Sequence, residues 1–520
     1  MKAYLMHRDS DLDLEQPLPI NAEALKQDLE LPTLFDAMAR GDAYLRELVE
    51  RVVLSSLGDP ESIRYRQEVL GDCLERAAIV RALYALAVEG VETKRKAHFY
   101  WYRDSPDSLL RKSLEILDLL VDVVKRLRKI VDEHGAAFRS EGLVRMFETL
   151  ERELDDDYLR VVDDHLRELR FRRGALLSAD LGRGNRGTHY VLRTPIEQSL
   201  LERITPGRVP SYSFSIPARD ENGFRALAEL RGKGINLVGS AVAQSADHVL
   251  SFFSLLRAEL GFYVGCLNLH EQLVEKGQAT CFPVAVPAEA DGAFAARGLY
   301  DAALAFHLGD RVVGNDVDAD RKALVIITGA NQGGKSTFLR SVGLAQLMVQ
   351  AGMFVPAESL RAGVCSGVFT HFKREEDASM TRGKLDEELN RMSEIAEVVT
   401  PGGLLLCNES FASTNEREGS EIARQVVRAM VEADVRVFYV THLFDLANSL
   451  YREESQTGLF LRAERTQDGG RSFRVLPGEP LPTSYGEDSY RRIFGLATNG
   501  RPRHDAQSTD NAPSPPDRGA

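Results

Sequence analysis

The stretch of this chain best suited to chemistry is a glycine-rich loop that ends in lysine, serine and threonine. It reads GANQGGKST and fits the pattern G-x-x-x-x-G-K-S. Glycines let backbone N–H groups turn inward around phosphate oxygens, while the lysine can bridge the outer phosphates and the serine can ligate Mg²⁺. The loop therefore predicts a site for ATP and Mg²⁺. Its nucleotide-binding residues are Gly329, Asn331, Gly333, Gly334, Lys335, Ser336 and Thr337.

Further reactive groups follow two apolar runs downstream. Leu404–Cys407 is followed by Asn408 and Glu409, and Val435–Tyr439 is followed shortly by His442. Glu409 suits the general base that orients an attacking water, so the expected catalytic residues are Glu409, Lys335 and His442, the last as a γ-phosphate sensor. Asn408 stands where a metal-supporting aspartate is usual. We expect Ser336, and Asn408 through water, to support the metal, with slow hydrolysis because the amide carries no charge.

These groups need strands and helices to position them. Leu324–Ile327 favours a buried strand before the loop, and helical spacing resumes after it. Alternating strands and helices predict a mostly parallel sheet, closed by an antiparallel hairpin. Gly383 and Lys384 start a helical pattern, whose N-terminus could meet a phosphate. In related ATPases this contact comes from a second subunit. Residues 277–300 look rich in loops. The candidate strands after the loop are Gly367–Phe372, Leu404–Cys407, Val435–Tyr439, Gly458–Arg462 and Ser472–Leu476.

The first half of the chain is mainly helical. Apolar residues recur at helical spacing from about Ala43 to Leu154 and again from Asn222 to Lys276, and Asp59-Pro60 favours a helix start. Residues 155–220 differ, with clustered arginines and short strands expected near Tyr190–Leu192 and Ser211–Ile216. Such a patch can contact a phosphate backbone, although charge runs are often only solvated. The DNA-contact candidates are Arg167, Arg170, Arg172, Arg173, Arg183 and Arg186.

Composition narrows the class of protein. A hydrophobic content of 43% and a charged content of 28% fit a soluble globular protein, and no uninterrupted apolar run is long enough to cross a bilayer, so no membrane partner is expected. The five cysteines are scattered, which favours the cytoplasm over a disulfide framework or zinc site. The net charge of −13 confines any nucleic-acid contact to a locally basic surface.

Several blocks together resemble the MutS family of DNA mismatch-repair ATPases. TGANQGGKSTFLRSVGLAQLMVQAGMFVPA resembles the family's P-loop block, NESFASTNEREG its D-E-x-x-x-G-T-S-T-x-x-G block, and THLFDL its T-H-Y/F-F-E-L. Asn315-Asp316 and Ser484-Tyr485-Gly486 match the family's N-D and S-Y-G. Val312 stands at the place of the family's adenine-stacking aromatic. We find no Phe-x-Glu mismatch-reading element, so a short MutS-like protein without that reading domain is expected.

The resemblance implies an α + α/β fold: a long helical lever/core domain followed by a P-loop (ABC-type) ATPase domain with a mostly parallel sheet. We expect a lead-in at 1–44, a helical core/lever domain at 45–297 with a small Arg-rich clamp-like insertion at about 155–220, the ATPase domain at 298–496, and a disordered tail at 497–520. In this family two ATPase domains pair, so a homodimer is expected.

The function expected is an ATP-dependent DNA-binding ATPase of DNA repair or recombination, in which the ATP state controls closure of the levers on duplex or branched DNA. Repair proteins are possible partners. Three alternatives stay open: a nucleotide-dependent scaffold with little hydrolysis, an ATPase that acts on structured RNA or ribosomes, and a protein-only partner in a repair complex. The fold by itself does not choose among them.

Overall fold

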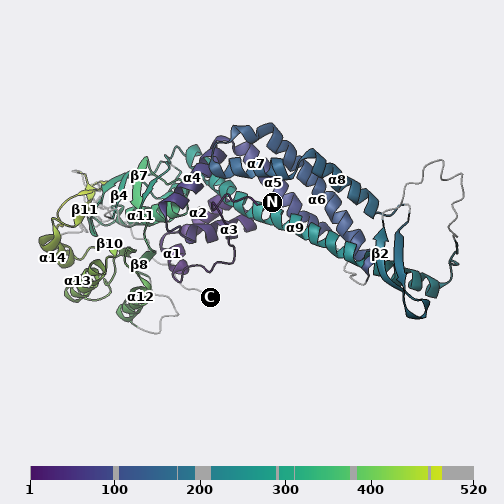
Figure 1. Cartoon of the computed structure of the whole chain (residues 1–520). Coiled ribbons are helices and arrows are strands. Elements are labelled where there is room, and N and C mark those ends of the chain that lie inside the picture. The colour runs from purple at the N-terminus through teal and green to yellow at the C-terminus, as the bar shows by residue number, and fades with distance from the viewer. Residues whose placement is uncertain are drawn as a thin grey trace, which may run out of the picture.

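A computed structural model describes residues 2–97, 105–172, 174–193, 212–287, 292–309, 311–374, 383–466 and 470–482. The molecule is elongated: an α/β part lies at one end, a bundle of long helices extends from it, and a β-hairpin lies at the far end (Figure 1). The predicted tail at 497–520, the Ser484-Tyr485-Gly486 block and Arg173 lie outside the described residues.

A six-stranded sheet forms the centre of the α/β part. Its order is β12-β11-β6-β10-β9-β8, and every neighbouring pair is parallel except the β11–β12 hairpin at one edge. All five residues from Leu324 to Thr328 are buried, as expected for a strand covered on both faces. The predicted strands are confirmed, with ends shifted by up to three residues. The strands are β6 (Leu324–Gly329), β8 (Val368–Phe372), β9 (Leu404–Asn408), β10 (Arg436–Val440), β11 (Leu459–Arg465) and β12 (Arg471–Pro477).

Helices cover this sheet, and a second sheet lies beside it. The second sheet has the order β3-β7-β4-β5, and two of its strands fall in the segment predicted to be rich in loops, so that interpretation was wrong. Short strands with little alternation, such as β3, depend on their neighbours for pairing. The strands are β3 (Val284–Val286), β4 (Phe294–Leu299), β5 (Asn315–Asp318) and β7 (Ser359–Gly363); the helices are α10 (Ala302–His307), α11 (Lys335–Gln350), α12 (Lys384–Val398), α13 (Glu416–Glu432) and α14 (Phe444–Glu454).

The helical part is built around α9 (Glu221–Glu275), which packs against α5 and α6. At about 1.5 Å per residue its 55 residues span roughly 80 Å. The helix start predicted at Asp59 is confirmed, because its carboxylate accepts the N–H of Ser62 at 2.7 Å. The other helices are α1 (Ala22–Asp28), α2 (Leu31–Ala39), α3 (Ala43–Leu54), α4 (Pro60–Glu75), α5 (Ala77–Ala97), α6 (Pro106–His134), η1 (Gly135–Ala137), α7 (Glu141–Glu153) and α8 (Asp156–Leu169).

By length and composition α9 is also apolar enough to cross a membrane, with an 18-residue window of mean hydropathy 1.4. That window is 72% buried inside the protein. Packing in the helical core therefore accounts for its apolar character, since the core helices of soluble proteins have the same composition.

The two parts of the molecule meet at the C-terminal end of α11. The backbone N–H of Leu57 donates to Gln350 O at 2.8 Å, and the Gln350 amide donates to Leu57 O at 3.1 Å. Arg66 of α4, almost fully buried, donates to Ala351 O at 3.0 Å and to Met6 O at 3.2 Å. The helix that begins at the glycine-rich loop therefore ends in hydrogen bonds to the helical part.

The far end of the molecule carries a two-stranded antiparallel hairpin of β1 (Leu176–Leu181) and β2 (Gly187–Arg193), joined through η2 (Arg183–Asn185) (Figure 1). The strand predicted at Tyr190–Leu192 is confirmed within β2. The strand predicted at Ser211–Ile216 is wrong over its described residues, 212–216, which form no strand. The partner of β2 is the preceding strand β1, which the sequence did not reveal because its alternation is weak.

Candidate functional site

The glycine-rich loop has the geometry of a phosphate cradle. It connects β6 to α11, so that the end of a buried parallel strand leads directly into a helix N-terminus. Gly329 and Gly334 adopt φ values of 110° and 89°, which disfavour side chains. A Cβ on Gly329 would also lie 2.8 Å from Ala463 N. These two positions explain why the loop needs glycine, and the helix N-terminus favours an anion in front of it.

Lys335, the first residue of α11, is held by the loop itself. Its ammonium donates to Gly329 O at 3.0 Å and to Ala330 O at 3.1 Å, and the residue is only 5% exposed. Burial lowers the pKa of Lys335, and the nearby Glu409 carboxylate partly opposes this effect. The side chain is thus fixed in the loop as a buried cation.

The two polar residues at the end of β9 reach this loop from across the sheet. Ser336 Oγ donates to Asn408 Oδ1 at 2.9 Å. Glu409 has a φ of 55°, an unfavourable left-handed conformation for a non-glycine residue, and its N–H donates to Val440 O at 2.9 Å. The strand end therefore places an amide oxygen beside Ser336 and turns the next carboxylate toward the loop.

Glu409 and His442 complete one open pocket with the loop. His442 Nδ1 lies 3.7 Å from Glu409 Oε1. Contact with His442 lowers the pKa of Glu409 against the opposing effect of burial, and Lys335 lowers it further. Glu409 is therefore a carboxylate at neutral pH, as a general base requires. The pocket has a volume of about 440 Å³ and is lined by Asn331, Gln332, Gly333, Gly334, Lys335, Ser336, Thr337, Glu409 and His442.

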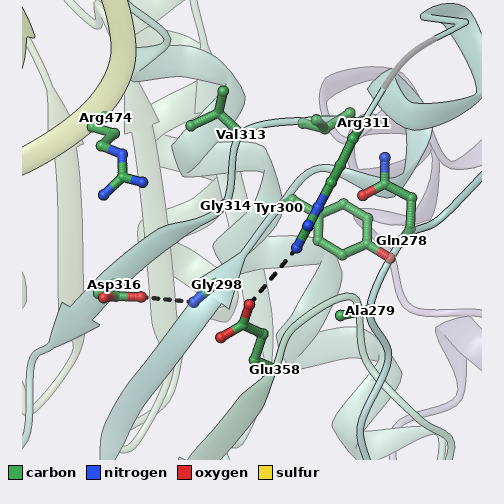
Figure 2. Close-up of a pocket in the computed structure, with 11 residues that line it drawn as sticks. Gln278, Ala279, Gly298, Tyr300, Arg311, Val313, Gly314, Asp316, Glu358 and Arg474 are labelled. Carbon is green, nitrogen blue, oxygen red and sulfur yellow. Dashed lines mark hydrogen bonds and ion pairs between the residues drawn. The ribbon is translucent and has the colours of Figure 1, made fainter.

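A second pocket, of about 420 Å³, lies beside β5 and is shown in Figure 2. Arg311 points toward Glu358, and its guanidinium lies 3.8 Å from that carboxylate. The Tyr300 hydroxyl and the Gln278 amide nitrogen are buried without a hydrogen-bond partner among the described residues. Buried polar groups are normally paired, so these two atoms are exceptions that lie at the lining of this pocket.

The two pockets lie on either side of the contact between β5 and β12. Asn315 donates to Phe473 O at 3.3 Å and accepts the N–H of Val475 at 2.7 Å. Phe473 borders Gly334 in the loop, whereas its neighbour Arg474 lines the second pocket together with Val312. The sequence indicated Val312 and the Asn315-Asp316 pair here. Tyr300 and Gln278 belong to no recognisable motif and become visible only as buried atoms without partners.

The predicted second-subunit contact does not line the loop pocket of its own chain. Gly383 is the N-cap residue of α12, whose first turn carries Asp386 and Glu387. Within the described residues no group of three or more His, Cys, Asp or Glu side chains could hold a metal.

The arginines predicted to contact DNA fall into two groups. Arg167 of α8 lies 3.1 Å from Asp164, and Arg170, the C-cap residue of α8, forms an ion pair with Asp118, so both arginines have carboxylate partners. Arg183 and Arg186 are exposed between β1 and β2, and neither has an ion pair with another described residue, nor does the exposed Arg172. The hairpin arginines therefore fit the predicted contact with a phosphate backbone better than Arg167 and Arg170 do, and that contact stays a prediction.

Two family models match this chain. The MutS2 N-terminal domain matches residues 58–276, and MutS domain V matches residues 325–488. The first range contains most of the helical part and the hairpin, and the second contains the loop, Asn408, Glu409 and His442. The chain is therefore similar to MutS-family proteins over these two ranges, and the predicted resemblance to that family is confirmed there.

Curated relatives agree with this assignment over about a third of the chain. A DNA mismatch repair protein MutS of Thermotoga neapolitana is 35% identical over 188 residues, which are 35% of this chain and 23% of the relative. The proteins of the same name from Porphyromonas gingivalis and Thermus aquaticus are each 34% identical, over 32% and 34% of this chain and 19% and 21% of their own lengths. The chain thus matches about a fifth of the length of these relatives.

Proposed function

We propose that this protein is an ATP-dependent DNA-binding ATPase of the MutS type. The observation that carries the proposal is the loop pocket, in which a buried lysine, a carboxylate and a histidine from three separate segments converge within the MutS domain V range. A phosphate cradle alone would bind a nucleotide without hydrolysing it. The Glu409 carboxylate adds a group able to orient water for attack on a γ-phosphate.

The residues of the site divide the work of hydrolysis. Backbone N–H groups of the loop and Lys335 hold the phosphates, and Glu409 accepts the proton of the attacking water. His442, whose Nδ1 lies 3.7 Å from Glu409 Oε1, senses the γ-phosphate. Ser336 Oγ and Asn408 Oδ1 are oxygen donors of the kind that Mg²⁺ takes in addition to phosphates and water. When bound, the ion would neutralise charge on the transferred phosphoryl group.

The second pocket is suited to the base of the nucleotide. It offers the apolar side chain of Val312 and the guanidinium of Arg474 as flanking groups, with the unpaired Tyr300 hydroxyl and Gln278 amide deeper inside. An adenine presents ring nitrogens and an amino group that could pair with such atoms. The contact of Asn315 with β12 lies between this pocket and the phosphate cradle. In a bound nucleotide the ribose, which joins the base to the phosphates, would lie over this contact.

Nucleotide binding would act on DNA through the helical part. A movement of α11 on phosphate binding would be passed to the helical part through the hydrogen bonds of Gln350 and Ala351. Helix α9 extends through the helical part toward the hairpin that carries Arg183 and Arg186 (Figure 1). Closure would pair two copies through their domain V faces, with Gly383 and Lys384 of α12 offered to the partner's phosphates. Arg183 and Arg186 would then contact the DNA backbone.

Site-directed variants test the site assignment. Lys335→Ala should weaken ATP binding roughly 10- to 100-fold, the effect of losing a charge-assisted hydrogen bond. Glu409→Gln should keep nucleotide binding but lower turnover by about 100-fold or more. Lys322→Ala, at the opposite end of β6, is the matched control and should change neither. If Lys335→Ala binds and hydrolyses ATP like the wild type, the assigned site is wrong.

A second candidate, a nucleotide-dependent scaffold with little hydrolysis, is favoured by Asn408. The Ser336–Asn408 contact joins two neutral groups where a charged ligand would hold Mg²⁺ more firmly. Steady-state turnover decides between the two, because robust hydrolysis by the wild type excludes the scaffold. DNA duplexes, branched DNA and structured RNA, compared at several salt concentrations with and without ATP, identify the polymer.

A further inference from the structure

A buried polar network lies directly behind Glu409. It joins the segment after β9 to the middle of β8 and to the second turn of α12, through His371, Ser410 and Glu388, which are 0%, 0% and 4% exposed. The loop pocket does not include any of these side chains. Polar groups buried this completely stabilise a fold only when they are paired, so their partners indicate what the network holds in place.

Ser410 is the residue through which the network reaches Glu409. Its hydroxyl oxygen lies 2.7 Å from both His371 O and His371 Nδ1, while its carbonyl accepts the Tyr439 hydroxyl at 2.7 Å. On the other side of Ser410, the Phe411 ring stacks on the His371 imidazole with centroids 5.4 Å apart. Ser410 is thus fixed from β8 and from β10.

The backbone around Ser410 needs this support. Glu409 and Phe411 have φ values of 55° and 60°, so two non-glycine residues in the left-handed region flank it. Such conformations cost of order 1–3 kcal/mol each and persist only where the surroundings enforce them. Released from its partners, the segment would relax and carry the Glu409 carboxylate away from the loop.

The same imidazole is tied to α12. His371 Nε2 lies 2.9 Å from Glu388 O, a carbonyl that can only accept, so Nε2 carries the proton and Nδ1 accepts from Ser410. Burial and the neighbouring Arg391 and Arg374 hold the pKa of His371 at about 4, so the ring is neutral. A second link runs from the Ser413 hydroxyl to the Glu388 carboxylate at 2.8 Å.

We propose that His371 is a positioning residue, which fixes the Glu409 carboxylate through Ser410 and makes that position depend on helix α12. The inference rests on the proposed ATPase function and extends it. Gly383 is the N-cap residue of α12 and lies at the end of the helix that would be offered to a second subunit. A shift of this helix on pairing would therefore pass through Glu388 to His371 and reach Glu409. Pairing of two copies would thereby influence the rate of hydrolysis within each copy, in addition to the contact that Gly383 and Lys384 offer to the partner's phosphates.

The test separates catalysis from binding. In His371→Leu and Ser410→Ala, kcat for ATP hydrolysis should fall roughly 10- to 100-fold, the effect of misplacing a catalytic group by about 1 Å. KM and the affinity for ADP should stay within about twofold, which also shows that the variants fold. His371→Asn, whose amide oxygen can still accept from Ser410, should recover part of kcat. Ser420→Ala is the control, because its buried hydroxyl has no hydrogen-bond partner among the described residues.

The outcomes distinguish this inference from the proposed function. If Glu409→Gln lowers kcat while both His371→Leu and Ser410→Ala retain the wild-type kcat, the positioning role is refuted and the ATPase assignment stands. If Glu409→Gln leaves kcat unchanged, the assignment of the base itself is wrong. Equal losses of kcat and ADP affinity in Ser410→Ala would show a merely structural role and would also refute the inference.

Discussion

A buried carboxyl group holds the N-terminal segment against the long helix. Glu259 of α9 is 0% exposed and accepts the backbone N–H groups of Leu5 at 2.7 Å and Leu12 at 3.4 Å. Burial raises the pKa of Glu259 from 4.5 to about 7, although these two hydrogen bonds oppose the effect. We predict that opening of residues 2–12 becomes easier as this group ionises.

The direction of this pH dependence follows from how many protons Glu259 binds in the closed and open states. Between pH 4.5 and 7 the closed state binds more protons at Glu259 than the open state, in which the carboxyl group is exposed to water, so closing is favoured at low pH. The contribution of Glu259 to the free energy that favours the closed state is fully present below pH 4.5 and is lost as the pH rises through about 7. Its full size is about 3 kcal/mol, at roughly 1.4 kcal/mol for each pH unit between the two pKa values.

Hydrogen exchange of the Leu5 and Leu12 amides measures this opening directly. After correction for the intrinsic pH dependence of exchange, the opening constant of the wild type should rise by roughly 70-fold from pH 5 to pH 8. Glu259→Gln, which cannot ionise, should show no such rise. Glu275→Gln, on the exposed side of the same helix, should behave like the wild type. Equal pH dependence in wild type and Glu259→Gln would refute the reasoning.

Three further predictions concern metal support, the junction and DNA. Asn408→Asp should raise hydrolysis at low Mg²⁺ because it adds a charged ligand; an unchanged rate across a Mg²⁺ titration would contradict this. Arg66→Met should destabilise the protein by about 2–5 kcal/mol, because two buried carbonyls lose their donor, and calorimetry should show a lower unfolding midpoint. Arg183→Ala combined with Arg186→Ala should reduce the slope of log affinity against log salt by about 2, whereas Arg170→Ala, already ion-paired, should change it less.

Much of the fold could be read from the sequence because its signals are local. The strands of the main sheet are continuous apolar runs, and the helices have clear apolar periodicity and caps such as Asp59. The second sheet and β1 were missed because short strands without alternation gain their stability from pairing with distant residues. The strand predicted at Ser211–Ile216 is wrong over its described residues, 212–216, for the converse reason, since β-forming residues do not make a strand without a pairing partner.

The sequence by itself determined the phosphate cradle. From Gly329 to Thr337 every required group lies in one contiguous segment, and local backbone geometry is enough to direct its N–H groups toward an anion. The same locality made Glu409 and His442 recognisable as the polar ends of apolar strands, though not as neighbours of each other.

Only the tertiary structure decided what surrounds that cradle. The strand order β6-β10-β9 brings His442 within 3.7 Å of Glu409, and the network behind Glu409 joins His371 to Ser410, 39 positions later in the chain. Glu259 likewise meets Leu5 across 254 positions. These contacts depend on long-range pairing and burial, which no local pattern encodes, because any buried polar group needs a partner but its own sequence neighbourhood does not say which.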